Sequence, residues 1–440
     1  MESVDSFSIP VGSLGNSPLF KLYTQLSLCF ALPQDSAKDQ NHIVGILNNG
    51  LQRMSEAFPW VSGQVTFSEE DSGTYRIVPL KRKLQAIVND LTGDKSISMD
   101  RLRKARFPFR MLDESILAPR PTISGPEPPV DWPVFFVQAT FVQGGVILTF
   151  VTQHQVMDMV GQEAVMRLLS KACSKESFTE EELSSGQLQS DIITPLEQTD
   201  LQIPESSPVA HSQTADCSWT YFAFSQKALR QLRSIAEEHL EGVEYVSSDD
   251  ALTAFIWQSV TRSRLDRLNS DNEVKLARAV DVRRYLDVHA SYPGLVHFMT
   301  YHTFEVRKVV NEPLGHIASD LRKSVDPRIS TLAHDTRSFM ALIDSLPDKA
   351  VVSFMSDQDP TVDISISSWS KVDAYNLDFG LGLGKPEAVR RPKFTPVESL
   401  VFFMPRAPNG EVVVGMCLRE DDLGRLQADE WYSKFADYIG

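Results

Sequence analysis

A histidine and an aspartate four residues apart, His154 and Asp158, are the side chains of this 440-residue chain best placed for acid–base chemistry. They follow an apolar run, Val146 to Val151, that predicts a strand, and they precede a segment with helical apolar spacing. His154 is therefore expected at a strand-to-helix junction, where its ring can be held facing a cleft. Imidazole titrates near neutrality, so it suits removal of a proton from a hydroxyl, which is a weak nucleophile without an adjacent base.

The spacing of His154 and Asp158 also permits two other interpretations. Asp158 could be the N-cap of the following helix, with His154 a buried core histidine. A metal pair is the second alternative, because positions i and i+4 share a helix face. Zinc normally takes three or four protein ligands, and no H-E-x-x-H or C-x-x-C sequence stands nearby.

A second polar segment lies about half a chain further on. Ser367-Ser368-Trp369-Ser370-Lys371 is followed by the glycine-rich stretch Asp378-Phe379-Gly380-Leu381-Gly382-Leu383-Gly384-Lys385-Pro386. The glycines indicate a loop with unusual backbone dihedral angles. A phosphate-binding loop is excluded by the glycine spacing and by Pro386, which stands where Ser or Thr would follow the lysine.

Taken together, the two segments resemble the paired signatures of the BAHD acyltransferases, HxxxD in mid-chain and DFGWG near the C-terminus. Leu381 in place of tryptophan, with two extra residues, is similar to the fungal branch that includes the trichothecene 3-O-acetyltransferases. The resemblance implies two chloramphenicol-acetyltransferase-like α/β domains with a solvent tunnel between them. It also implies direct acetyl transfer from acetyl-CoA, a co-substrate and not a bound cofactor, to a hydroxyl of a mycotoxin or terpenoid-like fungal metabolite.

The resemblance assigns roles to three catalytic positions. His154 would be the general base, taking the acceptor proton and passing it to the leaving thiolate. Trp369 would donate its indole N–H to the oxyanion of the tetrahedral intermediate, although a core aromatic is the alternative. Asp378 is grouped with the catalytic residues because it opens the second signature, even though that loop is structural and remote from the reacting atoms in the family.

The remaining site residues also come from matching positions in the family. Ser367 would lie on the acceptor side of the tunnel, on the same strand face as Trp369. In the family the motif aspartate turns away from the histidine, so Asp158 and Arg283 are expected to form a structural ion pair and not a triad. Three residues match positions near coenzyme A, namely Ser248, Arg284 and Lys371. Lys371 is expected to continue the strand face of Ser367 and Trp369.

Other activities stay open at this stage. The chain could be a hydrolase or metalloenzyme that uses His154, although no G-x-S-x-G nucleophile motif is present. It could also be an acyltransferase with an amine acceptor, or a binding protein that has kept the fold. The sequence motifs do not choose between a hydroxyl and an amine.

Composition bounds the domain organisation. From Lys175 to Asp216, acidic residues, Ser, Pro and Gln accumulate without apolar periodicity, which indicates an exposed linker with little structure. We therefore expect an N-terminal acyltransferase domain over residues 1–175, a crossover over 176–216 and a C-terminal domain over 217–440. Strands alternate with amphipathic helices in both halves, so an α/β fold is predicted.

The net charge and the terminal sequences indicate which kinds of partner and location to expect. The net charge of −15 disfavours nucleic acid and anionic membranes as partners. No signal peptide and no apolar run near 20 residues is present, so a cytoplasmic monomer without metal is expected. Basic clusters occur along the chain, among them Arg262 to Arg267 and Arg390-Arg391. Most of the clusters are expected to be solvated surface charge, although coenzyme A requires some positive charge locally.

Overall fold

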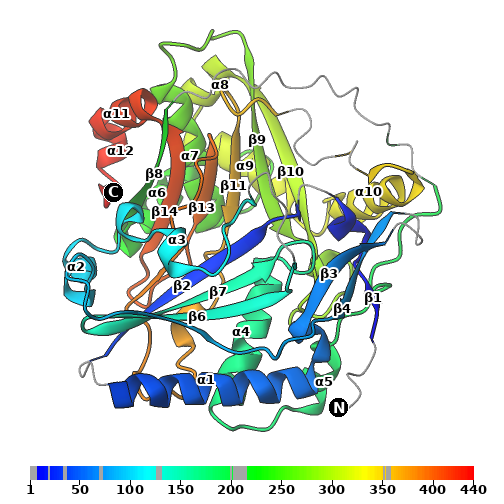
Figure 1. The fold of residues 1–440 in the computed structure, drawn as a ribbon. Helices are drawn as coiled ribbons and strands as arrows, with labels where there is room; N and C mark the ends of the chain where they lie inside the picture. The colour runs from blue at the N-terminus through cyan, green and yellow to red at the C-terminus, as the bar shows by residue number, and fades with distance from the viewer. Residues whose placement is uncertain are drawn as a thin grey trace.

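The computed structural model describes most of the chain, as residues 7–17, 20–32, 37–68, 73–124, 131–198, 201, 216–349, 352 and 358–440. Figure 1 shows strands at the centre of the molecule, with helices along its lower edge and its upper left side. Mixed sheets covered by helices confirm the predicted α/β class.

A five-stranded sheet organises the N-terminal half. In spatial order its strands are β12 (Ala388–Arg390), β2 (Tyr23–Ala31), β7 (Gly145–Gln153), β6 (Phe135–Val142) and β5 (Ile87–Leu91). Every residue of β6 and β7 is buried, as expected for strands covered on both faces. The two form the hairpin predicted from the sequence, with Val142 opposite Gly145 and Gly144 in the left-handed region at a φ of 78°.

A seven-stranded sheet organises the C-terminal half. Its spatial order is β10 (His297–Glu305), β9 (Glu273–Asp281), β11 (Ile364–Ser368), β13 (Leu400–Phe403), β14 (Val412–Arg419), β8 (Cys217–Phe224) and β15 (Ala436–Tyr438). The third strand in this order, β11, runs parallel to both of its neighbours, β9 and β13. A small third sheet joins β1 (Ile9–Pro10), β4 (Thr74–Pro79) and β3 (Gly63–Ser68).

Helices cover the sheets on apolar faces. In the N-terminal half α1 (Ala37–Ala57) packs against α4 (Met159–Cys173) along the lower edge of Figure 1. In the C-terminal half the buried helix α7 (Ser248–Ser263) packs against four neighbours, α6 (Gln226–Glu237), α8 (Val306–Asn311), α9 (Leu314–Ser324) and α11 (Glu420–Ala428). The remaining helices are α2 (Met99–Lys104), α3 (Glu114–Leu117), α5 (Glu180–Ser185), α10 (Leu332–Ser345) and α12 (Glu430–Ser433).

Helix α7 begins where the sequence provides caps. The Ser247 hydroxyl accepts from the Asp250 amide, and the Asp250 carboxylate accepts from the Ser247 amide, which is a reciprocal capping box. The capping box fixes where the helix starts. The start of the helix lies beside the end of β11, because Asp249 accepts hydrogen bonds from Ser368 and Ser370. The sequence of the cap thus places one helix end next to the predicted site.

The two halves share structure across the proposed domain boundary. Strand β12 belongs to the C-terminal half of the sequence but pairs with β2 in the N-terminal sheet. The expected linker is also partly ordered, since α5 has a capping box and Ile193 is buried. The expectation of little structure is therefore wrong for α5, while residues 199–200 and 202–215 lie outside the described part.

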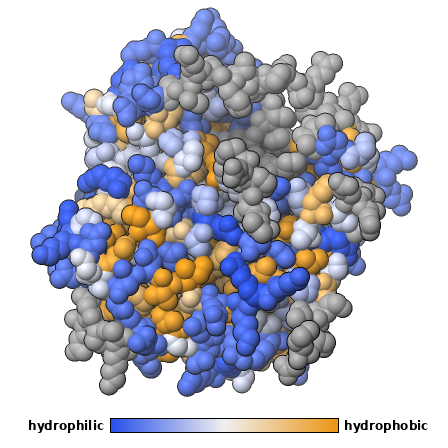
Figure 2. Space-filling view, viewed as in Figure 1, coloured by the Kyte–Doolittle hydropathy of each residue, from blue (hydrophilic) through white to orange (hydrophobic). Residues whose placement is uncertain are grey.

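The face seen in Figure 2 mixes hydrophilic and apolar side chains, with apolar ones gathered across its lower middle in front of the five-stranded sheet. Val88 and Ile116 are among the large apolar side chains that are exposed. Among the described residues, no helix combines the length and apolar character needed to span a membrane.

Candidate active site

A cavity of about 510 Å³ lies between the two large sheets. The first turn of α4, the facing ends of β9 and β10, and strands β11 and β13 line it. Apolar side chains make up much of its wall, including Phe20, Leu22, Met159, Val280, Met299, Trp369, Phe394 and Phe402. The polar groups that face it include His154, His297, Ser367, Arg391 and Glu398. A cavity whose wall is largely apolar, with polar groups at defined places, is typical of a small-molecule site.

His154 is held at the end of β7 by its own backbone and ring. Its amide donates to the Leu22 carbonyl at 2.9 Å, and its Nδ1 lies 3.0 Å from the Met157 carbonyl oxygen. A carbonyl can only accept, so Nδ1 carries the proton and Nε2 is the basic nitrogen of the neutral ring. Burial lowers the pKa of His154 below 6.5, which keeps the ring neutral at physiological pH.

A second histidine, His297 at the start of β10, stacks on His154 with ring centres 5.5 Å apart. Phe20 packs edge-on against both rings. Burial, followed by the neighbouring His154, lowers the pKa of His297 to about 3, so this ring is neutral as well. Sequence reasoning missed His297, because nothing in the residues around it marks a partner 143 positions away in the chain.

Asp158 does not contact the His154 ring. Both of its oxygens face Arg283, at 3.0 Å each, and they also accept from the amides of Gly161 and Val296. Burial acts to raise the pKa of Asp158, but the Arg283 charge outweighs it and the pKa lies below its usual value. The expected ion pair is thus present, and Asp158 is at the same time the N-cap of α4.

Arg283 also binds the chain segment that precedes β10. Its Nε donates to the Tyr292 carbonyl at 3.1 Å, its Nη2 donates to the Gly294 carbonyl at 2.6 Å, and its Nη1 also contacts Asp281. The pair therefore joins α4 of the N-terminal half to β9 and β10 of the C-terminal half.

Trp369 and Ser367 meet at the cavity wall. The indole N–H of Trp369 donates to the Ser367 hydroxyl oxygen at 3.0 Å. The expected oxyanion donor is therefore occupied within the protein, whereas the Ser367 hydroxyl keeps its own hydrogen to donate. Strand β11 ends at Ser368, so Trp369 already lies beyond the strand that was predicted to contain it.

Several arginines of the basic clusters are buried, although most of these clusters were expected to be solvated. Arg391 lines the cavity with 3% of its surface exposed, and Arg390 beside it is 5% exposed. Arg264 is 1% exposed and lies in a charged network near the cavity end formed by Glu398 and Ser399. Desolvation on burial lowers the pKa of both Arg264 and Arg391 to about 10, which leaves them charged at neutral pH.

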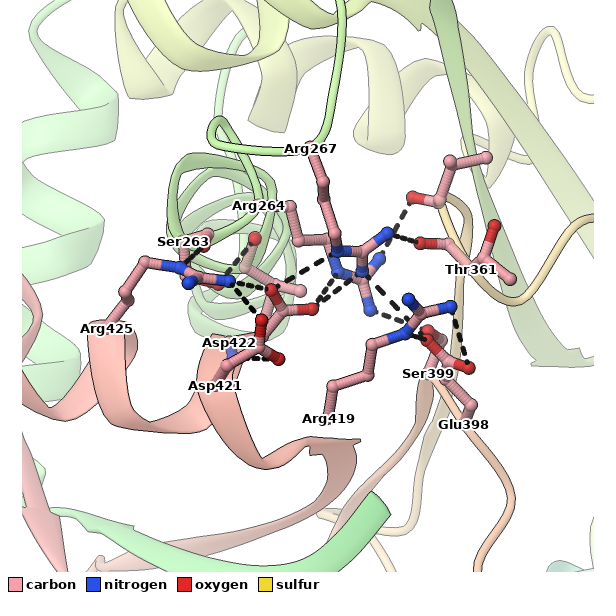
Figure 3. Close-up of polar contacts among 12 residues, drawn as sticks. Ser263, Arg264, Arg267, Thr361, Glu398, Ser399, Arg419, Asp421, Asp422 and Arg425 are labelled. Atoms are coloured by element: carbon pink, nitrogen blue, oxygen red, sulfur yellow. Dashed lines mark hydrogen bonds and ion pairs between the residues drawn. The ribbon is translucent and has the colours of Figure 1, made fainter. Parts of the chain in front are cut away.

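Figure 3 shows that charged network in detail. The fully buried Asp422 carboxylate contacts Arg267 and Arg425 at 2.6 Å and Arg264 at 3.5 Å. Arg264 also donates to the Ser399 hydroxyl at 2.6 Å, and Ser399 has a φ of 67°, an uncommon conformation for a residue with a side chain. The network therefore holds a strained segment of the cavity wall in place.

Four of the expected catalytic and coenzyme A-binding residues lie outside the cavity lining. Asp378 is exposed and accepts from the Gly380 amide, so its placement does not support a catalytic role. Lys371 is exposed in the turn after β11 and does not continue the strand face, contrary to expectation. Ser248 is the first residue of α7, and the exposed Arg284 donates to the Val325 carbonyl beyond α9.

Two other arginines contact the start of α7. Arg322 near the end of α9 donates to both Asp250 and Ser247, and Arg278 of β9 donates to Asp249 and Asp250. Within the described ranges, no group of three or more His, Cys, Asp or Glu side chains is placed to hold a metal ion.

Comparison with known proteins agrees with this geometry. A model of the trichothecene 3-O-acetyltransferase-like N-terminal domain matches residues 22–173, and a transferase family model matches residues 113–431. The chain is 43% identical to trichothecene 3-O-acetyltransferase TRI101 of Fusarium sporotrichioides, covering 100% of this chain and 98% of that protein. It is 42% identical to the O-acetyltransferase dmxR13 of a Cryptosporiopsis species, covering 97% of each.

Solved structures show the same similarity. The structure superimposes on F. graminearum TRI101 complexed with coenzyme A and T-2 mycotoxin with a TM-score of 0.93 and 43% identity, covering 99% of this chain and 100% of that one. Vinorine synthase matches with a TM-score of 0.66 at 15% identity, covering 99% of this chain and 95% of that one, which supports the fold alone.

Proposed function

This chain belongs to the trichothecene 3-O-acetyltransferase-like transferases, and we propose that it moves the acetyl group of acetyl-CoA onto a hydroxyl of a trichothecene-like fungal metabolite. The observation that carries the proposal is the state of His154. Its Nδ1 is engaged by the Met157 carbonyl, and its basic Nε2 has no hydrogen-bond partner among the described residues. His154 lines a cavity whose wall is largely apolar, and such a cavity suits a terpenoid-like alcohol.

In the proposed reaction, Nε2 of His154 removes the proton from the acceptor hydroxyl as its oxygen attacks the thioester carbonyl carbon. The C=O bond becomes a C–O⁻ in the tetrahedral intermediate. As the carbonyl re-forms, the C–S bond breaks and the coenzyme A thiolate takes the proton from His154. General base catalysis of this kind contributes roughly 10²–10⁴-fold to the rate.

We assign oxyanion stabilisation to the Ser367 hydroxyl, with Trp369 behind it. The Trp369 N–H donates to the Ser367 oxygen, which orients the hydroxyl and strengthens it as a donor. A preorganised donor at the developing charge is worth about 10²–10³-fold in turnover. Ser367→Ala should lower turnover on that scale, while Trp369→Phe should have a smaller effect.

We place coenzyme A at the start of α7, next to Ser248, Arg284 and Lys371. Arg278 and Arg322 bring positive charge there, although Asp249 and Asp250 offset it by pairing with them. A phosphate would gain from these side chains as well as from the free amides of a helix start.

Direct transfer within a ternary complex is expected, because the proposed chemistry requires no protein nucleophile. Acetyl-CoA alone should leave no stoichiometric acetyl adduct in an intact-mass measurement, and initial-rate lines for the two substrates should intersect. Parallel lines with an acetylated Cys or Ser peptide would overturn direct transfer.

The activity test is acetyl-CoA with deoxynivalenol and T-2 toxin, the acceptors named for the related crystal complexes. A product heavier by one acetyl group, formed together with free thiol, supports the proposal. Thiol release without acetylated product would indicate a hydrolase, and a matched amine acceptor tests the remaining alternative. Cytoplasmic location and a monomeric state are further predictions, to be checked by fractionation and light scattering.

A further inference from the structure

Arg391 is a buried cation in the wall of the cavity. It follows β12, and the carbon at the centre of its guanidinium lies 4.3 Å from the Phe394 ring centre, 4.6 Å from that of Phe402 and 5.5 Å from that of Trp369. Among the described residues that line the cavity, it is the one arginine or lysine. An aromatic cage holds the guanidinium plane while leaving its edge available for hydrogen bonds.

The hydrogen-bonding capacity of Arg391 is largely unused. A guanidinium has five N–H donors, yet within the described residues this one has a single bond, from Nη2 to the Thr122 hydroxyl at 3.4 Å. Its Nε is buried, with no hydrogen-bond partner in the part of the chain that the structure describes. Buried donors of charged groups are costly to leave unsatisfied, so the amino groups of this guanidinium at the cavity wall are suited to bind a ligand atom.

The neighbouring carboxylate offsets the charge without making an ion pair. Glu114 is the main attractive charge acting on Arg391, but its Oε2 atom accepts from the Gln25 amide group at 2.9 Å and from the Thr122 amide at 2.7 Å. Nε is buried and one N–H of Nη2 is directed at Thr122, so Nη1 is the amino group with both N–H bonds uncommitted among the described residues. Because Glu114 already offsets the charge of Arg391, an uncharged oxygen suits this donor.

We propose that Arg391 positions the acceptor by donating a hydrogen bond to a neutral carbonyl, ester or ether oxygen remote from the hydroxyl that is acetylated. The inference rests on the proposed acetyl transfer, and it names a residue that fixes which hydroxyl reaches His154. Because both residues line one cavity, a bond at Arg391 would hold the acceptor at one end while Nε2 of His154 meets the reacting hydroxyl.

The adjacent Arg390 provides a matched control. It is equally buried, but each of its three nitrogens donates to a backbone carbonyl, those of Phe107, Val389 and Arg106. It does not line the cavity. Arg390→Lys therefore removes structural bonds from a neighbouring buried arginine without touching the proposed contact.

The test measures kcat and KM for both substrates in Arg391→Gln, Arg391→Lys and Arg390→Lys, with deoxynivalenol and T-2 toxin as acceptors. Arg391→Gln should lower kcat/KM for the acceptor about 10- to 100-fold, the effect of losing a bond to a charged donor, and leave the KM of acetyl-CoA within about twofold. Arg391→Lys should recover most of that loss, because one charged donor suffices. Arg390→Lys should lower the melting temperature and change neither KM.

Two results would overturn the role of Arg391. One is an equal change in the KM of acetyl-CoA and of the acceptor in Arg391→Gln, and the other is an Arg391→Lys variant no better than Arg391→Gln. If Arg391→Gln does not fold, Arg391→Lys is compared with the wild type and with Arg390→Lys. The proposal then requires that Arg391→Lys retains a small loss in kcat/KM for the acceptor and no change for acetyl-CoA. Failure of the wild-type enzyme to acetylate either acceptor would contradict the proposed function instead.

Discussion

Replacing Asp158 by Asn should destabilise the protein more than it impairs the chemistry. Both oxygens of Asp158 accept hydrogen bonds, one from Arg283 and Gly161 and the other from Arg283 and Val296. An Asn side chain in either orientation turns its NH₂ group toward two N–H donors. The substitution therefore removes the charge and also creates a clash of donors in a buried place.

The expected loss of folding free energy depends on the hydrogen bonds that Arg283 keeps after the substitution. Breaking a buried ion pair from one side costs about 3–5 kcal/mol. Arg283 keeps the Asp281 carboxylate at 2.9 Å and two backbone carbonyls, so we expect the lower end, about 3 kcal/mol. That value corresponds to about a 150-fold change in the folding equilibrium.

The assay is urea and thermal unfolding of Asp158→Asn beside Asp281→Asn, with turnover measured well below the melting temperature. Asp281 binds the same arginine from a side chain that is 44% exposed, so its loss should cost less than about 1 kcal/mol. Because the folded-state pKa of Asp158 is lowered, its contribution is complete above pH 3.8 and is lost as the pH falls further. An unchanged melting temperature with a selective loss of turnover would refute the structural role and favour a triad.

Three further outcomes are expected. His154→Ala should lower turnover by about 100-fold or more while coenzyme A binding persists. Because burial lowers the pKa of His154, the wild-type kcat/KM should fall with decreasing pH only below 6.5. A fall in kcat/KM that begins above pH 6.5 would contradict the assignment of His154 as the base. Lys371→Ala should raise the KM of acetyl-CoA and not that of the acceptor in initial-rate measurements, and the reverse would place the donor elsewhere. Asp422→Asn should lower the free energy of unfolding by about 3 kcal/mol or more, since three arginines share this fully buried carboxylate, whereas Asp421→Asn, with an exposed side chain, should change it by less than about 1 kcal/mol.

The parts of the site visible in the sequence are those encoded locally. His154 follows a strand that its apolar run identifies, and Asp158 stands at the helix start that its capping ability predicts. The hairpin that delivers His154 is likewise signalled by two apolar runs around a glycine turn. The partner of Asp158 came from family resemblance, because no local pattern connects it to Arg283, 125 positions away.

The parts that sequence reasoning missed depend on packing between distant segments. Arg391 belongs to a basic cluster, and charged residues are rarely buried, so solvated charge was the natural expectation. Its aromatic cage forms only when β12 joins the N-terminal sheet while Phe402 arrives on β13 of the other. The predicted position of Lys371 on the strand face was wrong because β11 ends at Ser368 and the chain turns before Lys371.

The way His154 is oriented bears on the reaction it serves. In a Ser-His-Asp triad, a carboxylate on the second ring nitrogen stabilises the protonated imidazole. Here the Met157 carbonyl fixes the same tautomer without a full charge, and burial keeps the pKa of His154 low. A low pKa makes the ring a weaker base toward the acceptor hydroxyl but a stronger acid toward the departing thiolate. Because an ordinary thiol has a pKa of about 8.5, that thiolate accepts the proton readily. An uncharged orienting group therefore suits acyl transfer from a thioester, and it leaves Asp158 free to hold the two halves of the protein together.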